Sequence, residues 1–188
     1  MTTPENPCFK GTGFKTMLKA LEDMYGKDGL KKVLDAGTPE LRSFACKKIL
    51  DNEWIPDRIG SNLLLTADKL LGRNDTVLIR KVGYWIAKDN LKGIYKIYVK
   101  MSSIAGLLKR AEQIWRQYFN TGTVKVLLSE TKHYQFEVVE YIPDVDTCPG
   151  VLGWLDAFIE AYKVKGVASH PECKINGKNR CVFDIKLE

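Results

Sequence analysis

The spacing of apolar residues changes once along this chain, and that change predicts its fold class. Before Gly122 apolar residues recur every three or four positions, which is the period of a helix with one buried face. After Gly122 they alternate with polar residues, as the two faces of a strand require. The alternating positions are Val124, Val126, Leu128, Tyr134, Phe136 and Val138. Helices in the first part of the chain and strands in the last part predict an α+β fold, in which a helical layer packs on a small antiparallel sheet.

The apolar stripes also predict where the helices lie. We expect helices at 12–25, around 30–34, at 56–71, after Asn74 or Asp75 as far as Ile86, at 104–119, and from Val151 to Tyr162. The segment 104–119 has the strongest helical pattern of the chain. Residues 41–50 fit a further helix, and residues 94–99 fit either a helix or a strand.

Two hairpins are expected after the helices. The first joins the two alternating runs across a polar turn at 129–132, and the second has Asn176-Gly177 as its turn. The sequence shows no internal repeat and no linker, so we expect a single domain over 1–188. Within it we expect a flexible N-terminus at 1–10 and a strand-rich portion at 123–188.

Length and charge limit the classes of protein that the chain can belong to. It has 188 residues and no apolar run near the ~20 residues of a membrane-spanning helix. The N-terminus has neither a basic start nor an apolar core, so we expect a cytoplasmic protein without a signal peptide. The net charge of +6 is spread along the chain and not gathered into a basic stripe with interleaved aromatic residues. A nucleic-acid partner is therefore not expected.

The sequence lacks the usual catalytic motifs. It contains no Gly-rich phosphate loop, no Gly-x-Ser-x-Gly elbow and no His-Glu-x-x-His. Of its two histidines, His133 falls in a polar turn, where we expect a solvated side chain. Nothing in the sequence places neighbouring acids such as Asp144 and Asp146 on opposite sides of a cleft. We therefore expect a protein that is not an enzyme.

Three of the five cysteines fall near the C-terminus together with the second histidine. The set is Cys148, His170, Cys173 and Cys181. Thiolate sulfur and imidazole nitrogen are preferred zinc ligands, and three Cys with one His form a standard closed set. The sequence therefore predicts a zinc site at these four residues. Buried thiols that only fill the core, and a Cys173–Cys181 disulfide, are the alternatives.

The expected geometry gives such a zinc a structural role. With Asn176-Gly177 as the turn, Cys173 and Cys181 should face each other, with Cβ atoms about 4.5–5.5 Å apart. Cys148 would enter from the loop before the last helix. The metal would tie the start of that helix to the terminal hairpin and add its binding free energy to folding. Four protein ligands leave no open position for a substrate.

The end of the chain resembles the 4-vinyl-reductase-like domain. That pattern closes with an acid or His, a Cys, a Gly turn, and a Cys followed by an aromatic strand, as the stretch His170–Ile185 does. A long helix ending at Phe119, a strand pair, and Cys148 leading into Gly153 also fit. The family is similar in fold to subunits of the TRAPP vesicle-tethering complex and to haem-based nitric-oxide sensors. It includes the sensor domains of phenol-responsive transcription activators.

The resemblance has implications for metal and haem. In the phenol-sensor branch a zinc is held by an upstream Cys, an acid and two closing cysteines. Cys148, Cys173 and Cys181 match the thiols, and His170 stands where the acid would be. The haem branch would need a histidine on a buried helix. This sequence has no histidine before His133, so we do not expect a haem nitric-oxide sensor.

The resemblance also implies a ligand pocket. Many domains of this superfamily bind an apolar small molecule or a lipid chain between the helices and the sheet. The candidate lining residues are Trp85, Trp115, Tyr118, Phe119 and Trp154. The alternative is that these aromatic side chains simply fill the core.

Two functions are expected on these grounds. The first is a small-molecule sensor domain that binds an apolar ligand, has a structural zinc site and performs no catalysis. The second is a structural or protein-interaction module resembling a tethering-complex subunit. In either case we expect a homodimer formed through the first helix, with a protein partner as a further option. The apolar stripe of that helix is Phe14, Met17, Leu18, Leu21, Met24 and Tyr25.

Overall fold

The computed structural model describes residues 6–91, 103–141 and 145–188. Its elements are β1 (Cys8–Lys10), α1 (Gly11–Ala36), α2 (Pro39–Cys46), β2 (Trp54–Pro56), α3 (Asp57–Leu71), α4 (Val77–Asn90), α6 (Ile104–Leu108), α7 (Ala111–Tyr118), β3 (Thr123–Ser129), β4 (His133–Val139), α8 (Thr147–Ala161), β5 (Gly166–Glu172), η1 (Lys174–Asn176) and β6 (Cys181–Leu187). The predicted α+β class is confirmed. Residues 94–99, which fit either a helix or a strand, lie outside the described residues. Within the described ranges, no helix combines the length and the apolar character that crossing a membrane requires.

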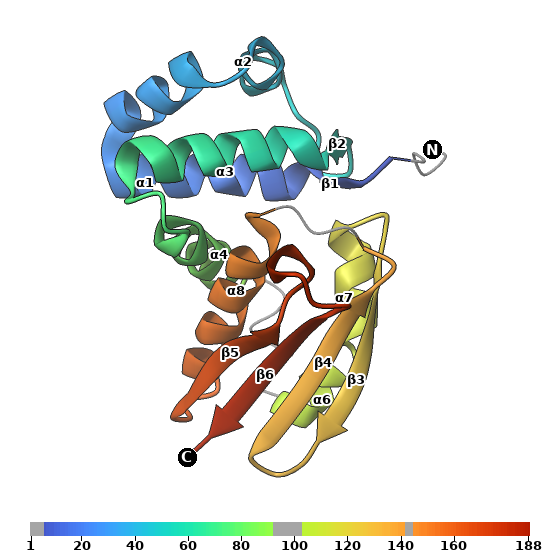
Figure 1. The fold of residues 1–188 in the computed structure, drawn as a ribbon. Helices are drawn as coiled ribbons and strands as arrows, with labels where there is room; N and C mark the ends of the chain where they lie inside the picture. The colour runs from blue at the N-terminus through green and yellow to red at the C-terminus, as the bar shows by residue number, and fades with distance from the viewer. Residues whose placement is uncertain (1–5, 92–102, 142–144) are drawn as a thin grey trace.

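The helices and the main sheet occupy opposite ends of the molecule. Figure 1 shows α1, α2 and α3 together at one end, the four-stranded sheet at the other, and α4 and α8 between them. The sheet has the strand order β3-β4-β6-β5, and all neighbouring strands are antiparallel. Both predicted hairpin pairings are present. Strand β4 of the first hairpin pairs with β6 of the second, so the two hairpins form one sheet.

Two apolar cores hold the fold together. The first lies among α1 to α4 and includes the fully buried Phe14 and Ile79. The second lies between the sheet and α6, α7 and α8, and includes Trp115 and Phe183. Phe119 packs against both cores and therefore marks the boundary between them.

The first two expected helices form one bent helix, α1. Gly26, the expected stop, has φ +71°, a left-handed conformation that glycine adopts without steric cost, so the chain bends there and the helix resumes. The six apolar residues of the expected dimer stripe all pack in the first core of their own chain. The homodimer therefore stays a prediction.

The expected helix 104–119 is wrong in one respect, because it is two helices. α6 ends at Leu108 and α7 begins at Ala111. Between them the N–H of Arg110 donates to the carbonyl of Leu107, three residues back, which tightens the turn and ends the regular helix. The break lets α7 run in its own direction and pack against β3. The apolar spacing is compatible with both arrangements and could not reveal the break.

The expectation of a flexible N-terminus up to residue 10 is also wrong for its last three residues. Cys8–Lys10 form β1, which pairs with β2 in a two-stranded sheet. Cys8 and Phe9 are buried, and the N–H of Cys8 donates to the side chain of Asn120 at 2.6 Å. Strands of three residues are too short to show an alternating pattern, so neither β1 nor β2 could be predicted.

Helices α4 and α8 cross with their backbones in close contact. A Cβ atom on Gly83 of α4 would lie 2.2 Å from the carbonyl oxygen of Gly150, so only glycine fits there. A Cβ atom on Gly153 of α8 would lie 1.9 Å from the carbonyl oxygen of Arg80. The Arg80 guanidinium also donates two hydrogen bonds to Asp156, at 2.6 and 2.8 Å. The crossing therefore joins the helical end of the molecule to the end that contains the sheet.

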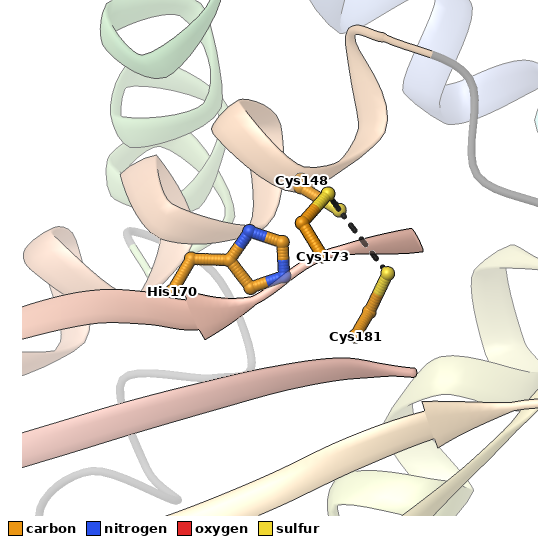
Figure 2. A group of neighbouring side chains, drawn as sticks. All are labelled: Cys148, His170, Cys173 and Cys181. Atoms are coloured by element: carbon orange, nitrogen blue, oxygen red, sulfur yellow. Dashed lines mark hydrogen bonds between the residues drawn. The ribbon is translucent and has the colours of Figure 1, made fainter. Parts of the chain in front are cut away.

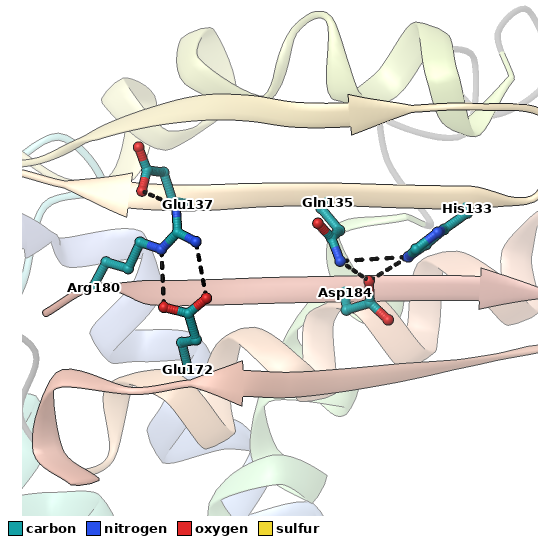
Figure 3. Close-up of polar contacts among 6 residues, drawn as sticks. All are labelled: His133, Gln135, Glu137, Glu172, Arg180 and Asp184. Carbon is teal, nitrogen blue, oxygen red and sulfur yellow. Dashed lines mark hydrogen bonds and ion pairs between the residues drawn. The ribbon is translucent and has the colours of Figure 1, made fainter. Parts of the chain in front are cut away.

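A polar network covers the outer face of the sheet (Figure 3). The Asp184 carboxylate, with 6% of its side chain exposed, lies 2.6 Å from His133 Nε2 and accepts a hydrogen bond from Gln135 at 2.7 Å. His133 was expected to be solvated in a turn; instead it is the first residue of β4 and bonds to Asp184. Beside this group, Arg180 forms two hydrogen bonds with Glu172.

We expect Asp184→Asn to flatten the acid side of the stability profile. Burial disfavours the Asp184 charge, but hydrogen bonds from Gln135 and His133 and nearby positive charge outweigh it, so the pKa of Asp184 lies below its ordinary value of 3.8. A carboxyl with a lowered pKa stabilises the folded state above the ordinary value, and this stabilisation is lost as the pH falls through the folded value. Urea unfolding between about pH 6 and pH 2 should show the wild type losing its advantage over the variant in the acid range. A difference in stability that does not change with pH would contradict the assignment.

Candidate ligand cavity and thiol cluster

A cavity of about 220 Å³ lies where the two cores meet. Its walls come from α3, α4, α6, α7 and α8, with contributions from the start of α1 and from the sheet. Most of the side chains around it are aliphatic or aromatic. The cavity therefore lies between the helices and the sheet, where the sequence resemblance implied a pocket.

Four of the five predicted pocket residues line this cavity. They are Trp115, Tyr118, Phe119 and Trp154. Trp115 stacks on Phe119 with ring centroids 4.3 Å apart, and Tyr118 meets Trp154 edge to face at 5.5 Å. Trp85 is not among the lining residues; it packs at the edge of the first core, with the Lys19 ammonium 5.0 Å from its ring centroid.

One end of the cavity is polar, and sequence reasoning missed it. This polar end consists of Asp57, Ser61, Tyr141, Asp146 and Thr147, all of which line the cavity. Ser61 donates to Asp146 at 2.8 Å, and Tyr141 donates to Asp57 at 3.0 Å. The Tyr141 hydroxyl also lies 3.5 Å from that of Thr147. Hydrogen bonds therefore link these side chains to one another around the polar end.

The folding of the helix ends explains how the polar end forms. Asp57 is the first residue of α3, and Asp146 directly precedes α8, so both carboxylates sit at the positive ends of helix dipoles. Ser61 lies one turn after Asp57 on the same side of α3. Burial, followed by the nearby charge of Asp57, raises the pKa of Tyr141 far above its ordinary value. The phenol is therefore a neutral hydrogen-bond donor.

The four predicted metal ligands come together beside the first turn of α8 (Figure 2), and two of them, Cys148 and Cys181, line a small pocket that shares Tyr141 and Val151 with the cavity. The ligand atoms of Cys148, His170, Cys173 and Cys181 all lie within 4.8 Å of one another. The Sγ atom of Cys148 is 3.8 Å from that of Cys181 and 4.0 Å from that of Cys173. All three thiols are buried and free, so the alternative of a Cys173–Cys181 disulfide does not occur in this structure.

Two details of this thiol cluster differ from the expectation. Cys148 lies in the first turn of α8 and not in the loop before it. Cys173 follows the end of β5, so it lies just beyond the ladder in which Glu172 pairs with Val182. The turn after it contains η1, and Gly177 has φ +78° there. The convergence of the thiols therefore depends on the fold of α8 onto the sheet as much as on the hairpin.

The electrostatic environment of the cluster favours neutral groups. Burial, together with the two neighbouring thiols, raises the pKa of Cys148 well above its ordinary value. Burial lowers the pKa of His170, whose Nε2 atom is buried without a hydrogen-bond partner. The His170 ring stacks on Phe183 with centroids 4.5 Å apart.

Comparison with solved structures identifies the fold. Neither a protein-family model nor a curated protein sequence matches this chain. Among solved structures, an H-NOX protein from S. oneidensis in the Fe(II)NO ligation state matches with a TM-score of 0.75 and 12% sequence identity, over 95% of this chain and 99% of that chain. The fold is the H-NOX fold.

Other solved H-NOX proteins agree with this result. An oxygen-binding H-NOX domain related to soluble guanylate cyclases matches with a TM-score of 0.70 and 17% identity, over 95% of both chains. A mutant H-NOX protein from K. algicida in its Fe(II) unliganded form matches with a TM-score of 0.76 and 14% identity, over 95% of this chain and 96% of that one. Of the families named on the sequence resemblance, the haem nitric-oxide sensors are thus the ones whose fold this chain has. The similarity to 4-vinyl-reductase-like domains and tethering subunits stays a prediction.

These comparisons contradict the prediction of structural zinc as the cofactor. The matching structures are described as Fe(II) proteins and as subjects of haem distortion, so the cofactor associated with this fold is haem. The zinc prediction rests on the ligand chemistry of three thiols and an imidazole, on the expected hairpin geometry and on the resemblance to the phenol-sensor branch. A cluster of possible ligands is weaker evidence for the identity of a cofactor than the cofactor found in proteins of the same fold.

The residues around the cavity, however, do not fit a haem. Haem iron needs an axial ligand, and the resemblance to the haem branch implies that this ligand would be a histidine on a buried helix. Both histidines of this chain lie elsewhere, His133 on the outer face of the sheet and His170 in the thiol cluster. Among the described residues, no Lys or Arg lines the cavity to pair with haem propionates, and its charged groups are the carboxylates of Asp57 and Asp146. These would repel propionates.

Proposed function

We propose that this chain is a sensor domain that binds one small apolar molecule in the cavity between its two cores and needs no haem. The observation that carries the proposal is the cavity itself, lined mainly by aliphatic and aromatic side chains. The H-NOX proteins of the same fold include an oxygen-binding domain and an Fe(II)NO complex, which supports a small-molecule sensor. The proposal does not extend to this chain the binding of a small molecule to haem iron.

The cavity volume sets the size of the ligand. At about 220 Å³ it exceeds the ~150 Å³ of an apolar cavity that holds benzene, and falls short of the ~300–1,000 Å³ of typical pockets for drug-sized ligands. A ligand with one ring and a short substituent fits this range. Burial of its apolar surface supplies the binding free energy, at about 25 cal/mol per Å² of area removed from water.

The position of the cavity explains how binding could be sensed. Its walls include α4 and α8, the two helices whose crossing joins the helical end to the sheet end. A ligand that fills the space beside this crossing would favour one arrangement of the two ends over others. The output passes to another polypeptide, and the homodimer and the protein partner remain predictions.

We expect Val151→Phe to abolish ligand binding without unfolding the protein. Val151, on α8, is half-buried and lines the cavity, so the larger ring takes the space that a ligand would occupy. Toluene is a suitable probe, with binding measured by NMR titration. The wild type should show one saturable site, and the variant should bind at least about tenfold more weakly with a similar melting temperature.

Val77→Phe is the matched control for this experiment. Val77, at the start of α4, is 50% exposed and does not line the cavity, so the same substitution there should leave toluene binding unchanged. Toluene binding that is absent in the wild type, or equal in the wild type and Val151→Phe, would contradict the proposal.

We further propose that the thiol cluster, which adjoins the cavity, binds a metal ion. The supporting observation is the convergence of four ligand atoms within 4.8 Å, one of them the buried, unpartnered Nε2 atom of His170. This proposal names the residues that bind a metal ion. It does not assign that ion as the cofactor of the fold. Cobalt(II) is a suitable probe, because thiolate coordination gives it strong charge-transfer absorption.

We expect one equivalent of cobalt(II) to bind the wild type, and Cys181→Ser to lose this binding. Removing one thiolate leaves three ligands and lowers the affinity by an expected ~10- to 100-fold or more. Cys46→Ser is the control, because Cys46 is exposed and lies outside the cluster. Cobalt binding without thiolate absorption, or binding that Cys181→Ser leaves unchanged, would show that the thiols only fill the core.

A further inference from the structure

The short strand β1 forms part of the cavity wall and lies where the two ends of the molecule meet. Its Phe9 lines the cavity, is 5% exposed and pairs in an isolated antiparallel bridge with Phe119, which lines the cavity as well. β1 also pairs with β2 at the helical end, whereas Phe119 follows α7 and leads toward β3 (Figure 1). The pairing of Phe9 with Phe119 therefore bounds the cavity at the junction of the two ends.

Asn120 holds this wall in place with hydrogen bonds to the segment 6–8. Its side-chain oxygen accepts from the N–H of Cys8 at 2.6 Å, and its side-chain amide donates to the carbonyl of Asn6 at 2.8 Å. Its backbone N–H donates to the carbonyl of Cys8 at 3.1 Å. These three hydrogen bonds form the Asn120 clasp. Asn120 does not line the cavity, so the clasp fastens β1 from outside it.

From this arrangement we infer that Asn120 determines the largest ligand that the cavity accepts. The clasp favours a closed arrangement, in which Phe9 stands beside Phe119. A ligand too large for the closed arrangement binds only when β1 moves away from Phe119. Asn120 is a positioning residue, because it acts through Phe9 and does not touch the ligand. The inference rests on the proposed function, because it concerns the cavity that binds the ligand.

β1 is the part of the wall that moves at the lowest free energy. It has three residues and pairs with a strand of three residues, and a two-stranded ribbon is only marginally stable by itself. Other walls come from α3, α4 and α8, which have 14 or 15 residues each and pack in the two cores. Elements with many buried contacts open at a higher free energy. The clasp is therefore an important part of what keeps β1 beside Phe119.

Movement of Phe9 would enlarge the cavity directly. Its ring packs on Gly13 and Gly60, both of which line the cavity. A Cβ atom on Gly60 would lie 2.9 Å from the ring, and one on Gly13 would lie 3.1 Å from it. Since neither glycine has a side chain that could take the place of the ring, the space becomes available to a second ring of a ligand when Phe9 moves.

The size of the effect follows from the equilibrium between the closed and open arrangements. A ligand that binds only the open arrangement has its affinity reduced by the fraction of molecules that are open. Truncation of Asn120 removes two of the three clasp bonds, which should raise the open fraction about tenfold. A ligand that fits the closed arrangement gains nothing from this change.

Toluene and biphenyl, which have one and two rings, test the inference by NMR titration of the full chain. We expect Asn120→Ala to bind biphenyl about tenfold more tightly than the wild type does. Its toluene affinity should stay within about twofold of the wild type, because toluene fits the closed arrangement. A merely structural role of Asn120 would lower both affinities together.

Asn62→Ala is the matched control. The Asn62 side chain accepts a hydrogen bond from the N–H of Thr38 at 3.0 Å and does not line the cavity. This variant loses a comparable bond at another place and should change neither affinity. Phe9→Leu is a second variant that acts on the wall itself. It keeps the clasp but replaces the ring with a smaller side chain, so biphenyl should again bind more tightly than in the wild type.

The outcomes separate the inference from the proposed function. If toluene binds the wild type but Asn120→Ala leaves biphenyl affinity unchanged or lowers both affinities, the inference fails and the function stands. An equal gain in biphenyl affinity for Asn62→Ala also overturns it. If Asn120→Ala does not fold, Phe9→Leu decides, and an unchanged biphenyl affinity there contradicts the inference. If toluene does not bind the wild type, the proposed function fails and the inference fails with it.

Discussion

Gly153→Ala is expected to lower the free energy of unfolding by about 3 kcal/mol, at the upper end of typical overpacking costs. The new Cβ atom would lie 1.9 Å from the carbonyl oxygen of Arg80 and 2.6 Å from the amide nitrogen of Tyr84. Both are backbone atoms of α4, so no side-chain rotation can relieve the clash and the two helices must separate. Thermal unfolding should show a decrease in melting temperature of roughly 6–12 °C.

Gly150→Ala is the matched control on the same helix. No atom lies within 4 Å of the position that its Cβ would occupy, and its backbone is helical. Alanine there should stabilise the helix by up to about 1 kcal/mol, because it restricts the unfolded chain. Equal melting temperatures for Gly150→Ala and Gly153→Ala would contradict the description of the crossing.

Phe183→Ala is expected to cost at least as much, about 3–5 kcal/mol of stability. The Phe183 ring is 1% exposed and stacks between Phe136, with centroids 5.1 Å apart, and His170, with centroids 4.5 Å apart. Its truncation leaves a cavity in the centre of the second core and removes the surface against which His170 packs. The thiol cluster should then bind cobalt(II) more weakly as well.

Phe44→Ala, on α2, provides the comparison for this prediction. Phe44 is only partly buried, with the Lys47 ammonium 4.0 Å from its ring centroid. The same truncation there should cost less than half as much, because water can fill the space that the ring leaves. Urea unfolding of both variants measures the difference, and an equal or larger loss for Phe44→Ala would contradict the assignment of Phe183 to the core.

The parts of the fold that the sequence predicts are those with a long periodic signal. The change of period at Gly122 is enough for the α+β class and for both hairpins of the sheet. Three-residue strands such as Cys8–Lys10 carry no such signal, and the break after Leu108 leaves the helical spacing intact. These features depend on tertiary contacts, namely the pairing with β2 and the packing of α7 on the sheet.

The same distinction holds for the candidate sites. The thiol cluster was predictable, because cysteine and histidine are rare residues whose chemistry suggests a shared role. The polar end of the cavity was not, because Asp57 and Asp146 are far apart in sequence and each resembles an ordinary acid at the start of a helix. Trp85 was placed in the pocket because it is aromatic, but its contacts are with the first core.

The cofactor prediction shows the limit of arguing from side chains alone. The zinc prediction followed from four candidate ligand residues near the C-terminus, three Cys and one His, whereas the matching H-NOX structures are described as haem proteins. Both histidines of this chain lie away from the cavity, and for this reason we propose a sensor that needs no haem. Fold and residues therefore have to be considered together.

A crystal structure of the protein soaked with bromobenzene tests the central claim most directly, because bromine can be located by its anomalous scattering. The account predicts one bromine site inside the cavity bounded by α3, α4, α7 and α8, with the ring beside Trp115. A structure with a haem in that cavity, or with side chains filling it and no bromine inside, would contradict the account.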